Sequence, residues 1–427
     1  MTRSDTDTEG RFGSQSIQDL MGRRPIHPFP ARMAPGIAFE TLSRSRPLRV
    51  LDPMSGSGTV LAVARKCGHR TWGFDLDPLA VLLGKTWTSA IDTKSVERRA
   101  RDVLRRATAR YETLGARDAF PTGATRETKE FVRYWFDRKA RRQLEALSTC
   151  IARLRDPQVR NALWCAFSRL IITKQSGASL AMDLSHSRPH RAFERAPTLP
   201  FDGFARAVSS IAENCLDKRD RNIGPASRVN VGDARRLPLR DQSIDLVLTS
   251  PPYLNAIDYL RCSKFTLVWM GYSIDELRVI RAGSVGTEVG LPQAEAGIAG
   301  QVLRNLRLRP KLSARMESIL TRYIDDMRAA MREVRRVLVP GGQATYVVGE
   351  NTVRGTFVPN SLIVAELAGD LGLEVLSSRS RDLPPNRRYM PPPGARSASM
   401  DARMRCEVVM TLQKTGTMPC GAKSSPR

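Results

Sequence analysis

The segment from Pro47 to Asp77 constrains the fold more than any other part of this sequence. An apolar run ending at Leu51 is followed by Ser55-Gly56-Ser57-Gly58, an apolar helical stretch over 59–66, and a second apolar run ending at Asp75. Glycines at such a turn let the backbone approach a ligand, and the helix that follows presents free amides to an anion. The order strand, glycine loop, helix and strand predicts the opening of an α/β nucleotide-binding sheet.

An acidic residue closes the second of these strands. Asp75 follows Gly58 by seventeen residues, an arrangement in which a carboxylate accepts hydrogen bonds from ribose hydroxyls. Two plainer interpretations stay open at this point: the glycine loop is an ordinary tight turn, and Asp75-Leu76-Asp77-Pro78 is a helix cap. Packing alone does not explain why both features occur together.

A second group of strand signals lies after residue 225. An apolar strand leads into Gly232-Asp233-Ala234, and Ile244 to Leu248 lead into Thr249-Ser250-Pro251-Pro252-Tyr253. Asp233 is expected at the carboxyl edge of the sheet, where it can accept from the adenine amino group of a nucleotide cofactor. Taken alone, such a segment is more often only a turn.

The segment from Thr249 to Tyr253 is the most specific motif in the chain. An exocyclic base amine is a poor nucleophile because its lone pair is delocalised into the ring, so catalysis must stabilise a pyramidal, increasingly positive nitrogen. The Ser250 hydroxyl and the Pro251 carbonyl are two acceptors for the N–H bonds. Pro252 stiffens the turn, and the Tyr253 ring can stack on a base flipped out of its helix. The alternative is a proline-rich loop that ends a strand with a core tyrosine.

The charge of the chain points to a polyanionic partner. Lysine and arginine total 68 against 43 aspartates and glutamates, a surplus of 25, which favours phosphate contacts, although an acidic protein or an anionic membrane is also compatible. The seven cysteines are scattered and only four histidines are present, so we expect no metal site and no disulfide framework. No apolar run approaches membrane-spanning length, and a cytoplasmic protein without membrane contact is expected.

The sequence pattern divides the chain into five parts. Residues 1–20 and 414–427 are poor in core-forming residues and are expected to be disordered. Residues 21–94 are expected to form the cofactor half of the α/β domain, and residues 226–413 its catalytic half. Between them, residues 95–225 show the three- and four-residue spacing of apolar side chains that is typical of helices. We expect a helical insertion between strands of one sheet.

Local signals predict further elements of the second half. Ser273 and Glu276 fit a capping box at a helix start. Apolar residues from Met316 to Leu338 form one stripe of a long helix, which is expected to end at Pro340-Gly341-Gly342. Residues 344–348 are then expected to form a buried strand.

The motifs at 52–59 and 249–253 resemble those of the amino-methyltransferase family that modifies cytosine N4 or adenine N6 in DNA. The resemblance implies a doubly wound α/β fold with a seven-stranded, Rossmann-like sheet, S-adenosylmethionine as cofactor and methyl donor, and base flipping. It assigns the glycine loop to the methionine part of the cofactor, Asp75 to its ribose, and the motif at 249–253 to the target base. The expected cofactor-binding residues are Asp52, Pro53, Gly56, Gly58, Thr59, Asp75 and Asp233, and the expected catalytic residues are Ser250, Pro251, Pro252 and Tyr253.

A third segment, His27-Pro28-Phe29-Pro30-Ala31-Arg32-Met33, resembles the additional cofactor-side motif of the same family. The alternative is an irregular segment that packs on the sheet. The sequence departs from the family in one respect, because Asp233 follows Asp75 by 158 residues, whereas the common arrangement keeps these two strands close. The insertion is therefore a candidate target-recognition region.

Two basic segments are candidates for contacts with nucleic acid. His186, Arg188 and Arg191 lie in a dense polar run, and arginine side chains match both phosphates and base edges. A solvated linker explains this run equally well. Arg387 and Arg388 lie in an extended proline-rich stretch, which suits either a nucleic-acid channel or a surface polyproline segment.

Together these features predict a site-specific methyltransferase acting on cytosine N4 in double-stranded DNA, because serine precedes Pro-Pro-Tyr as it often does in enzymes of that specificity. Serine can accept from either base amine, so adenine N6 remains a candidate. An RNA methyltransferase and a catalytically inactive nucleic-acid-binding protein on the same fold are further alternatives. The lack of a separate RNA-binding module disfavours the first, and the presence of Asp75, Ser250 and Tyr253 disfavours the second. The neighbouring genes would decide whether a cognate restriction endonuclease accompanies the protein.

Overall fold

In the described part of the chain, seven strands form one sheet in the order β10-β11-β7-β6-β1-β2-β5. The structure is a computed structural model that describes residues 15–30, 32–43, 46–174, 176–184, 189–220, 224–254, 260–287, 297–353, 356–383 and 406–416. The strands of the sheet are β1 (Arg49–Asp52), β2 (Arg70–Asp75), β5 (Arg228–Val231), β6 (Ile244–Thr249), β7 (Leu338–Gly349), β10 (Leu373–Asp382) and β11 (Cys406–Lys414). The predicted α/β class with a seven-stranded, Rossmann-like sheet is confirmed.

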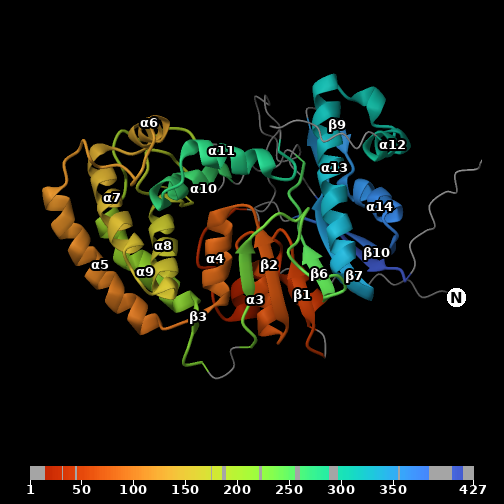
Figure 1. Cartoon of the computed structure of the whole chain (residues 1–427), viewed down its shortest axis with the longest axis horizontal. Helices are drawn as coiled ribbons and strands as arrows, with labels where there is room; N and C mark the ends of the chain where they lie inside the picture. The colour runs from red at the N-terminus through yellow and green to blue at the C-terminus, as the bar shows by residue number, and fades with distance from the viewer. Residues whose placement is uncertain are drawn as a thin grey trace, which may run out of the picture. The chain divides into compact units, whose positions relative to one another are not determined.

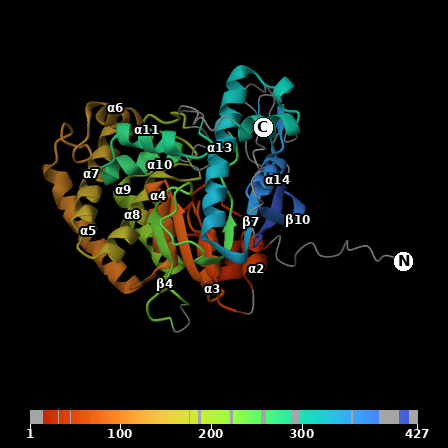
Figure 2. The ribbon, with the colours of Figure 1, turned by 45° about the vertical axis from the view of Figure 1, so that its right-hand side comes forward.

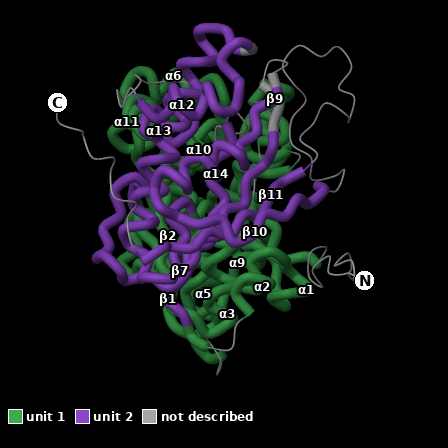
Figure 3. Tube along the Cα trace, turned by 90° about the vertical axis from the view of Figure 1, so that its right-hand side faces the viewer, with its two compact units in different colours: residues 1–47, 55–231, 258–281 green, residues 48–54, 232–257, 282–427 purple. Residues whose placement is uncertain are grey.

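The chain divides into two compact units, drawn in different colours in Figure 3. Unit 1 comprises residues 1–47, 55–231 and 258–281, and unit 2 comprises residues 48–54, 232–257 and 282–427. Each unit therefore contains segments that are far apart in the sequence.

In unit 1, strands β2 and β5 run parallel, and two helices pack against them. α3 (Thr59–Lys66) and α4 (Pro78–Thr88) bring Leu61 and Val81 onto Val229 of β5 in one buried cluster. The register places Asp75 beside Val231. Ligands of α/β sheets bind outside the carboxyl ends of parallel strands, and Asp75 lies at that edge.

The described residues between the parallel strands β3 (Ala90–Ile91) and β4 (Leu216–Asp217) form five helices. Figures 1 and 2 show them gathered into a bundle, in which α5 packs on α7 and α9, and α8 packs on α9 and α4. Asp137 divides one periodic stretch into two helices, because its carboxylate accepts from the amides of Lys139 and Ala140 at 2.8 and 3.0 Å and begins α7. The helices are α5 (Thr93–Thr113), α6 (Arg126–Trp135), α7 (Arg138–Ala152), α8 (Pro157–Ile171) and α9 (Pro200–Asn214).

The chain returns to unit 1 through α10 (Leu260–Leu267), η1 (Val268–Met270) and the start of α11 (Ile274–Gly283). The ring of Phe265 in α10 lies edge-on to the rings of Phe131 and Trp135, at centroid distances of 5.2 and 5.0 Å. The predicted capping box is confirmed, since the Ser273 amide donates to Glu276 Oε2 at 2.7 Å and the Glu276 amide donates to Ser273 Oγ at 3.2 Å.

Unit 2 contains the other five strands of the sheet. β6 is parallel to β1 and β7, whereas β11 is antiparallel to β7 and β10. The remaining elements of this unit are α12 (Ile298–Asn305), η2 (Arg309–Lys311), α13 (Ala314–Val337), α14 (Asn360–Asp370), and the antiparallel pair β8 (Asn351–Val353) and β9 (Thr356–Val358).

The transition from α13 to β7 differs from the prediction. α13 ends at Val337 and β7 begins at once with Leu338 rather than at residue 344. The register against β6 shifts between Leu338 and Gln343, so Pro340-Gly341-Gly342 forms an irregularity inside the strand. Proline and glycine occur within strands at such bulges, where the ladder of hydrogen bonds is interrupted.

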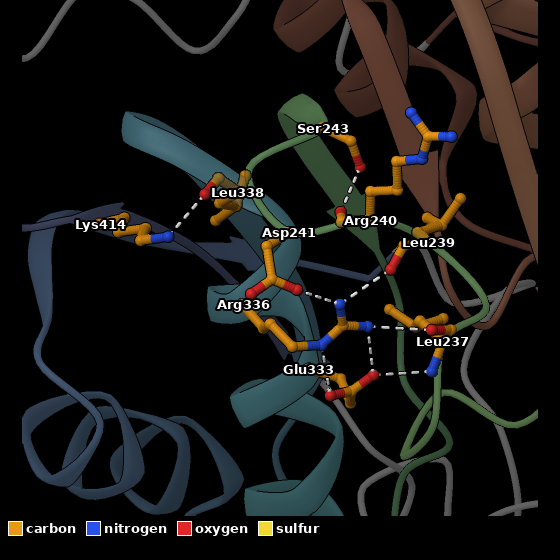
Figure 4. Close-up of polar contacts among 9 residues, drawn as sticks. All are labelled: Leu237, Leu239, Arg240, Asp241, Ser243, Glu333, Arg336, Leu338 and Lys414. Atoms are coloured by element: carbon orange, nitrogen blue, oxygen red, sulfur yellow. Dashed lines mark hydrogen bonds and ion pairs between the residues drawn. The ribbon is translucent and has the colours of Figure 1, made fainter.

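Arg336 fixes the C-terminal end of α13 to the loop before β6 (Figure 4). Its guanidinium pairs with Glu333 at 2.8 Å and Asp241 at 2.6 Å, and donates to the carbonyls of Leu237 and Leu239 at 2.9 and 2.8 Å. These bonds raise the pKa of Arg336 above its ordinary value, with the Glu333 contact as the largest cause. The loop that leads into the Thr249 motif is thereby held on α13.

In the described residues before β1, the chain forms the helices α1 (Ile17–Met21) and α2 (Pro35–Leu42). α1 begins within the stretch for which we expected disorder, because Ser16 and Asp19 form a capping box. Across the described ranges, every helix is too short or too polar to cross a membrane.

Candidate active site

The glycine loop requires glycine at two positions. Gly56 and Gly58 have φ angles of +49° and +88°, and Gly58 is the residue immediately before α3. A Cβ added at Gly58 would lie 2.9 Å from the Cα of Gly84 in α4, closer than real Cβ contacts allow. The loop therefore lies directly against α4, and no side chain among the described residues caps the amides at the start of α3.

Three hydroxyls of this loop are buried and open, in the sense that they lack a hydrogen-bond partner among the described residues. They belong to Ser55, Ser57 and Thr59, which are 5 to 7 % exposed. Buried polar atoms almost always have a partner, so this cluster indicates a ligand with polar groups. Thr59 was expected from the sequence. Ser55 and Ser57 were not, although their alternation with the glycines was a signal.

The carboxylates of Asp75 and Asp77 have different partners, and only Asp77 caps a helix. Asp75 Oδ2 accepts from the Gly56 amide at 2.8 Å and Oδ1 accepts from the Asp77 amide at 2.9 Å. Asp77 is the helix cap, since it accepts from the Leu79 amide at 2.9 Å and from Ser263 Oγ at 2.5 Å. Asp75 thus holds the glycine loop and, as a carboxylate, retains acceptor capacity for a ligand.

The segment beginning at His27 packs beside the glycine loop. The Phe29 ring would lie 3.9 Å from a Cβ at Gly56. His27 is buried with its Nε2 3.0 Å from Ser168 Oγ of α8, and burial lowers the pKa of His27 well below its ordinary value. The histidine is therefore neutral at physiological pH and acts through packing and a hydrogen bond. Ala31 of this segment lies outside the described residues.

In unit 2, a buried bond connects the residues that open the two principal motifs. The parallel register of β1 and β6 pairs Val50 with Leu246 and Leu51 with Val247. At the ends of these strands, Thr249 Oγ1 donates to Asp52 Oδ1 at 2.8 Å, and both residues are at most 3 % exposed. The same oxygen accepts from the Met54 amide at 3.2 Å, across the buried Pro53. Asp52 therefore orients both the start of the glycine loop and the start of the Thr249 motif.

In the turn that follows β6, two polar side chains are in hydrogen-bonding distance of each other. Ser250 Oγ lies 3.3 Å from Tyr253 Oη, and both side chains are half-buried, whereas Pro251 is buried. Pro252 lies beside Gly286, because a Cβ added at Gly286 would be 4.0 Å from its Cβ. All four expected catalytic residues thus lie in one short turn at the carboxyl edge of the sheet.

Asp233 is already engaged by an arginine that the sequence analysis missed. Arg235 donates to both Asp233 oxygens, at 3.0 and 2.7 Å, and its other nitrogen pairs with Asp326 of α13 at 2.5 Å. Hydrogen bonds and charge from these two acids raise the pKa of Arg235 against the opposing effect of burial. The adenine role of Asp233 stays a prediction. No local sequence pattern predicts the ion pair between Arg235 and Asp326, because the two residues are 91 positions apart.

Of the predicted nucleic-acid contacts, only Arg191 belongs to the described residues; those at 186, 188, 387 and 388 lie outside them. Arg191 is exposed, and its guanidinium lies 5.6 Å from the centroid of the Tyr134 ring. Tyr134 is 53 % exposed. An exposed aromatic ring beside an arginine is a surface on which a nucleic-acid base can stack.

Comparison with known proteins gives one sequence relative with nearly full coverage. The chain is 23 % identical to the Type II methyltransferase M.MvaI of Kocuria varians, over 94 % of this chain and 93 % of that protein. No family model matches the sequence.

Two solved structures illustrate the structural likenesses. A SAM-dependent methyltransferase from Methanosarcina mazei is 10 % identical and superimposes with a TM-score of 0.31 over 87 % of this chain and 95 % of that one. A candidate DNA modification methylase from Thermus thermophilus, complexed with S-adenosyl-L-methionine, is 21 % identical, with a TM-score of 0.22 over 45 % of this chain and 55 % of that one.

Proposed function

We propose that the protein is a site-specific DNA methyltransferase that transfers the methyl group of S-adenosylmethionine to an exocyclic base amine, cytosine N4. The observation that carries the proposal is the buried bond between Asp52 and Thr249. It ties the strand that opens the glycine loop to the strand that opens the Thr-Ser-Pro-Pro-Tyr turn. The Type II methyltransferase that shares 23 % identity over 94 % of this chain supports the same reaction class.

The glycine loop fits S-adenosylmethionine by its donor set. The uncapped amides at the start of α3 suit a carboxylate, and the three open hydroxyls of Ser55, Ser57 and Thr59 suit its ammonium and carboxylate groups. Asp75, fixed by the Gly56 amide, offers its remaining acceptor capacity to the ribose. When bound, the cofactor supplies an electrophilic methyl group on a positively charged sulfur.

The turn from Ser250 to Tyr253 suits the other reactant, the base. The Ser250 hydroxyl and the Pro251 carbonyl accept from the amine N–H bonds and stabilise the positive charge that develops on nitrogen. The Tyr253 ring stacks on the flipped base. The contact between Ser250 and Tyr253 leaves Ser250 Oγ a free lone pair, because a hydroxyl accepts two hydrogen bonds.

The test is methyl transfer from labelled S-adenosylmethionine to duplex DNA, followed by mass spectrometry of the digested product. N4-methylcytosine is expected. N6-methyladenine as sole product would replace the base assignment, and label in RNA but never in DNA would replace the substrate class. Cofactor binding without transfer to any nucleic acid would indicate an inactive binding protein.

A further inference from the structure

The segment between α11 and the undescribed residues after 287 is fixed to one face of α13. Asp326 holds Arg235, which donates to the Gly283 carbonyl at 2.6 Å. One helical turn earlier, Arg322 donates to the Thr287 carbonyl at 3.1 Å. This face of α13 therefore positions residues 283–287, all within unit 2.

Tyr323, on the same face of α13, lies beside the catalytic turn. A Cβ added at Gly286 would be 3.5 Å from Cδ2 of Tyr323 and 4.0 Å from Cβ of Pro252, so Gly286 is in contact distance of both. Tyr323 is only 1 % exposed, and its Oη has no hydrogen-bond partner among the described residues. A buried phenol usually finds a partner, and this one lies near the residues assigned to the base.

A second such group belongs to Glu350, at the end of the strand that runs parallel to β6. It directly follows β7, the strand next to β6, and its Oε1 accepts from the Ser361 hydroxyl and from the Ser361 amide at 3.3 Å. Its Oε2 is buried without a partner among the described residues. The carboxylate is thus oriented by α14 with one oxygen left open. After burial itself, the Glu350 charge is the cause that raises the pKa of Tyr323.

We propose that Tyr323 Oη and Glu350 Oε2 bind the hydrogen-bonding edge of the flipped base and select bases that carry an amine beside an unprotonated ring nitrogen. Glu350 accepts one amine hydrogen, in a bond shared with an acceptor of the 249–253 turn, and Tyr323 donates to the ring nitrogen. Cytosine and adenine share this edge, whereas thymine and guanine present a carbonyl beside a ring N–H, and the carboxylate repels that carbonyl. This inference rests on the proposed function and adds a base-selecting site outside the 249–253 motif.

The two groups also fit the catalytic requirement. An amine hydrogen bound to a carboxylate gains strength as the nitrogen becomes positive, so Glu350 stabilises the transition state more than the bound base. Tyr323 acts on a ring atom whose charge changes less. We therefore expect Glu350→Gln to lower kcat about 10- to 100-fold and Tyr323→Phe to lower kcat/KM about tenfold, chiefly through KM.

The decisive test combines Tyr323→Phe with a base that lacks the ring nitrogen, 3-deazacytosine or 1-deazaadenine according to the product identified for the wild type. The wild type should lose about tenfold on this base, and Tyr323→Phe should lose nothing further, because the hydrogen bond is already absent. Tyr323→Phe should also melt at the same or a higher temperature, since it removes a buried hydroxyl without a partner. A tyrosine with a purely structural role does not predict that Tyr323→Phe becomes insensitive to the deaza base.

Tyr346→Phe is the matched control. Tyr346 of β7 is fully buried, its Oη also lacks a partner among the described residues, and burial alone raises its pKa, without a contribution from Glu350. This variant should keep the full sensitivity to the deaza base. Wild-type methylation by both Tyr323→Phe and Glu350→Gln, or additive losses for Tyr323→Phe and the deaza base, would overturn the inference alone. Failure of the wild type to methylate any nucleic acid would overturn the proposed function as well.

Discussion

The glycine loop in unit 1 and the Thr249 to Tyr253 turn in unit 2 both follow a strand of the sheet, yet they satisfy their polar groups in opposite ways. In the loop, the backbone is held by Asp75 while the hydroxyls of Ser55, Ser57 and Thr59 stay open. In the turn, the side chains are held: Thr249 is bonded to Asp52, and Ser250 lies against Tyr253.

This difference indicates a separate function for each region. A loop with a fixed backbone and open, buried hydroxyls needs a ligand to supply the missing hydrogen bonds, because leaving such groups unsatisfied costs free energy. A turn whose side chains are already bonded is oriented before its substrate arrives, which suits a role in the reaction step. The first region should therefore control cofactor affinity, and the second the rate.

Ser250→Ala should give the largest effect and separate the two regions. Removing one oriented hydrogen-bonding group from a developing charge lowers the transfer rate by about 100-fold, while the dissociation constant of the cofactor should stay unchanged. Single-turnover kinetics and calorimetry measure the two quantities. Ser243→Ala is the control, because that hydroxyl donates to the Arg240 carbonyl, at 2.6 Å, and is not assigned to the base. Transfer at the wild-type rate by Ser250→Ala would return the turn to a structural role.

Asp75→Ala should produce the complementary effect. Loss of a charged acceptor for the ribose hydroxyls should weaken cofactor binding by about 1.5 to 3 kcal/mol, measured by calorimetry on the folded variant. Asp77→Asn is the control, since asparagine can still cap α4 and Asp77 is not assigned to the cofactor. An unchanged dissociation constant for Asp75→Ala, or an equal loss for both variants, would contradict the assignment.

The buried carboxyl of Asp77 predicts a smaller effect, on the pH dependence of stability, that concerns only the unit of the glycine loop. Burial raises its pKa to about 7 from the ordinary 3.8, so the folded protein binds a proton there more tightly than the unfolded chain. The stabilisation from this proton is complete below pH 3.8 and is lost as the pH rises through 7. Relative to Asp77→Asn, the wild type should lose unfolding free energy between about pH 4 and about pH 7 in urea titrations. A difference that does not vary with pH would show that Asp77 is ionised throughout.

Arg191→Ala should give the smallest effect and should change neither region. The loss of one phosphate contact weakens DNA binding at most about tenfold and reduces the slope of log affinity against log salt by about one. Binding measured at several salt concentrations gives both values. Arg240→Ala, which removes an equal charge from an exposed position of unit 2, should leave the slope closer to that of the wild type. Equal slopes for the wild type and Arg191→Ala would remove Arg191 from the DNA surface.

The sequence by itself determined the features whose contacts are local. The glycine loop, its strand and helix, and the capping box at Ser273 follow from residue types a few positions apart, because backbone turns and helix ends are decided by neighbouring residues. The acid at Asp75 could be predicted because the strand and helix between it and Gly56 have regular lengths, although the two residues are 19 apart.

Only the tertiary structure decided which distant groups meet. Asp233 and Asp75 follow similar strands, yet Asp233 is paired with Arg235 and through it with Asp326, while Asp75 binds a backbone amide. Asp52 and Thr249 are 197 residues apart and meet because β1 and β6 are neighbours in the sheet. The unpaired groups of Tyr323 and Glu350 could not be predicted from the sequence either. Burial and hydrogen-bond satisfaction depend on strand order and helix packing, which no local pattern of residues encodes.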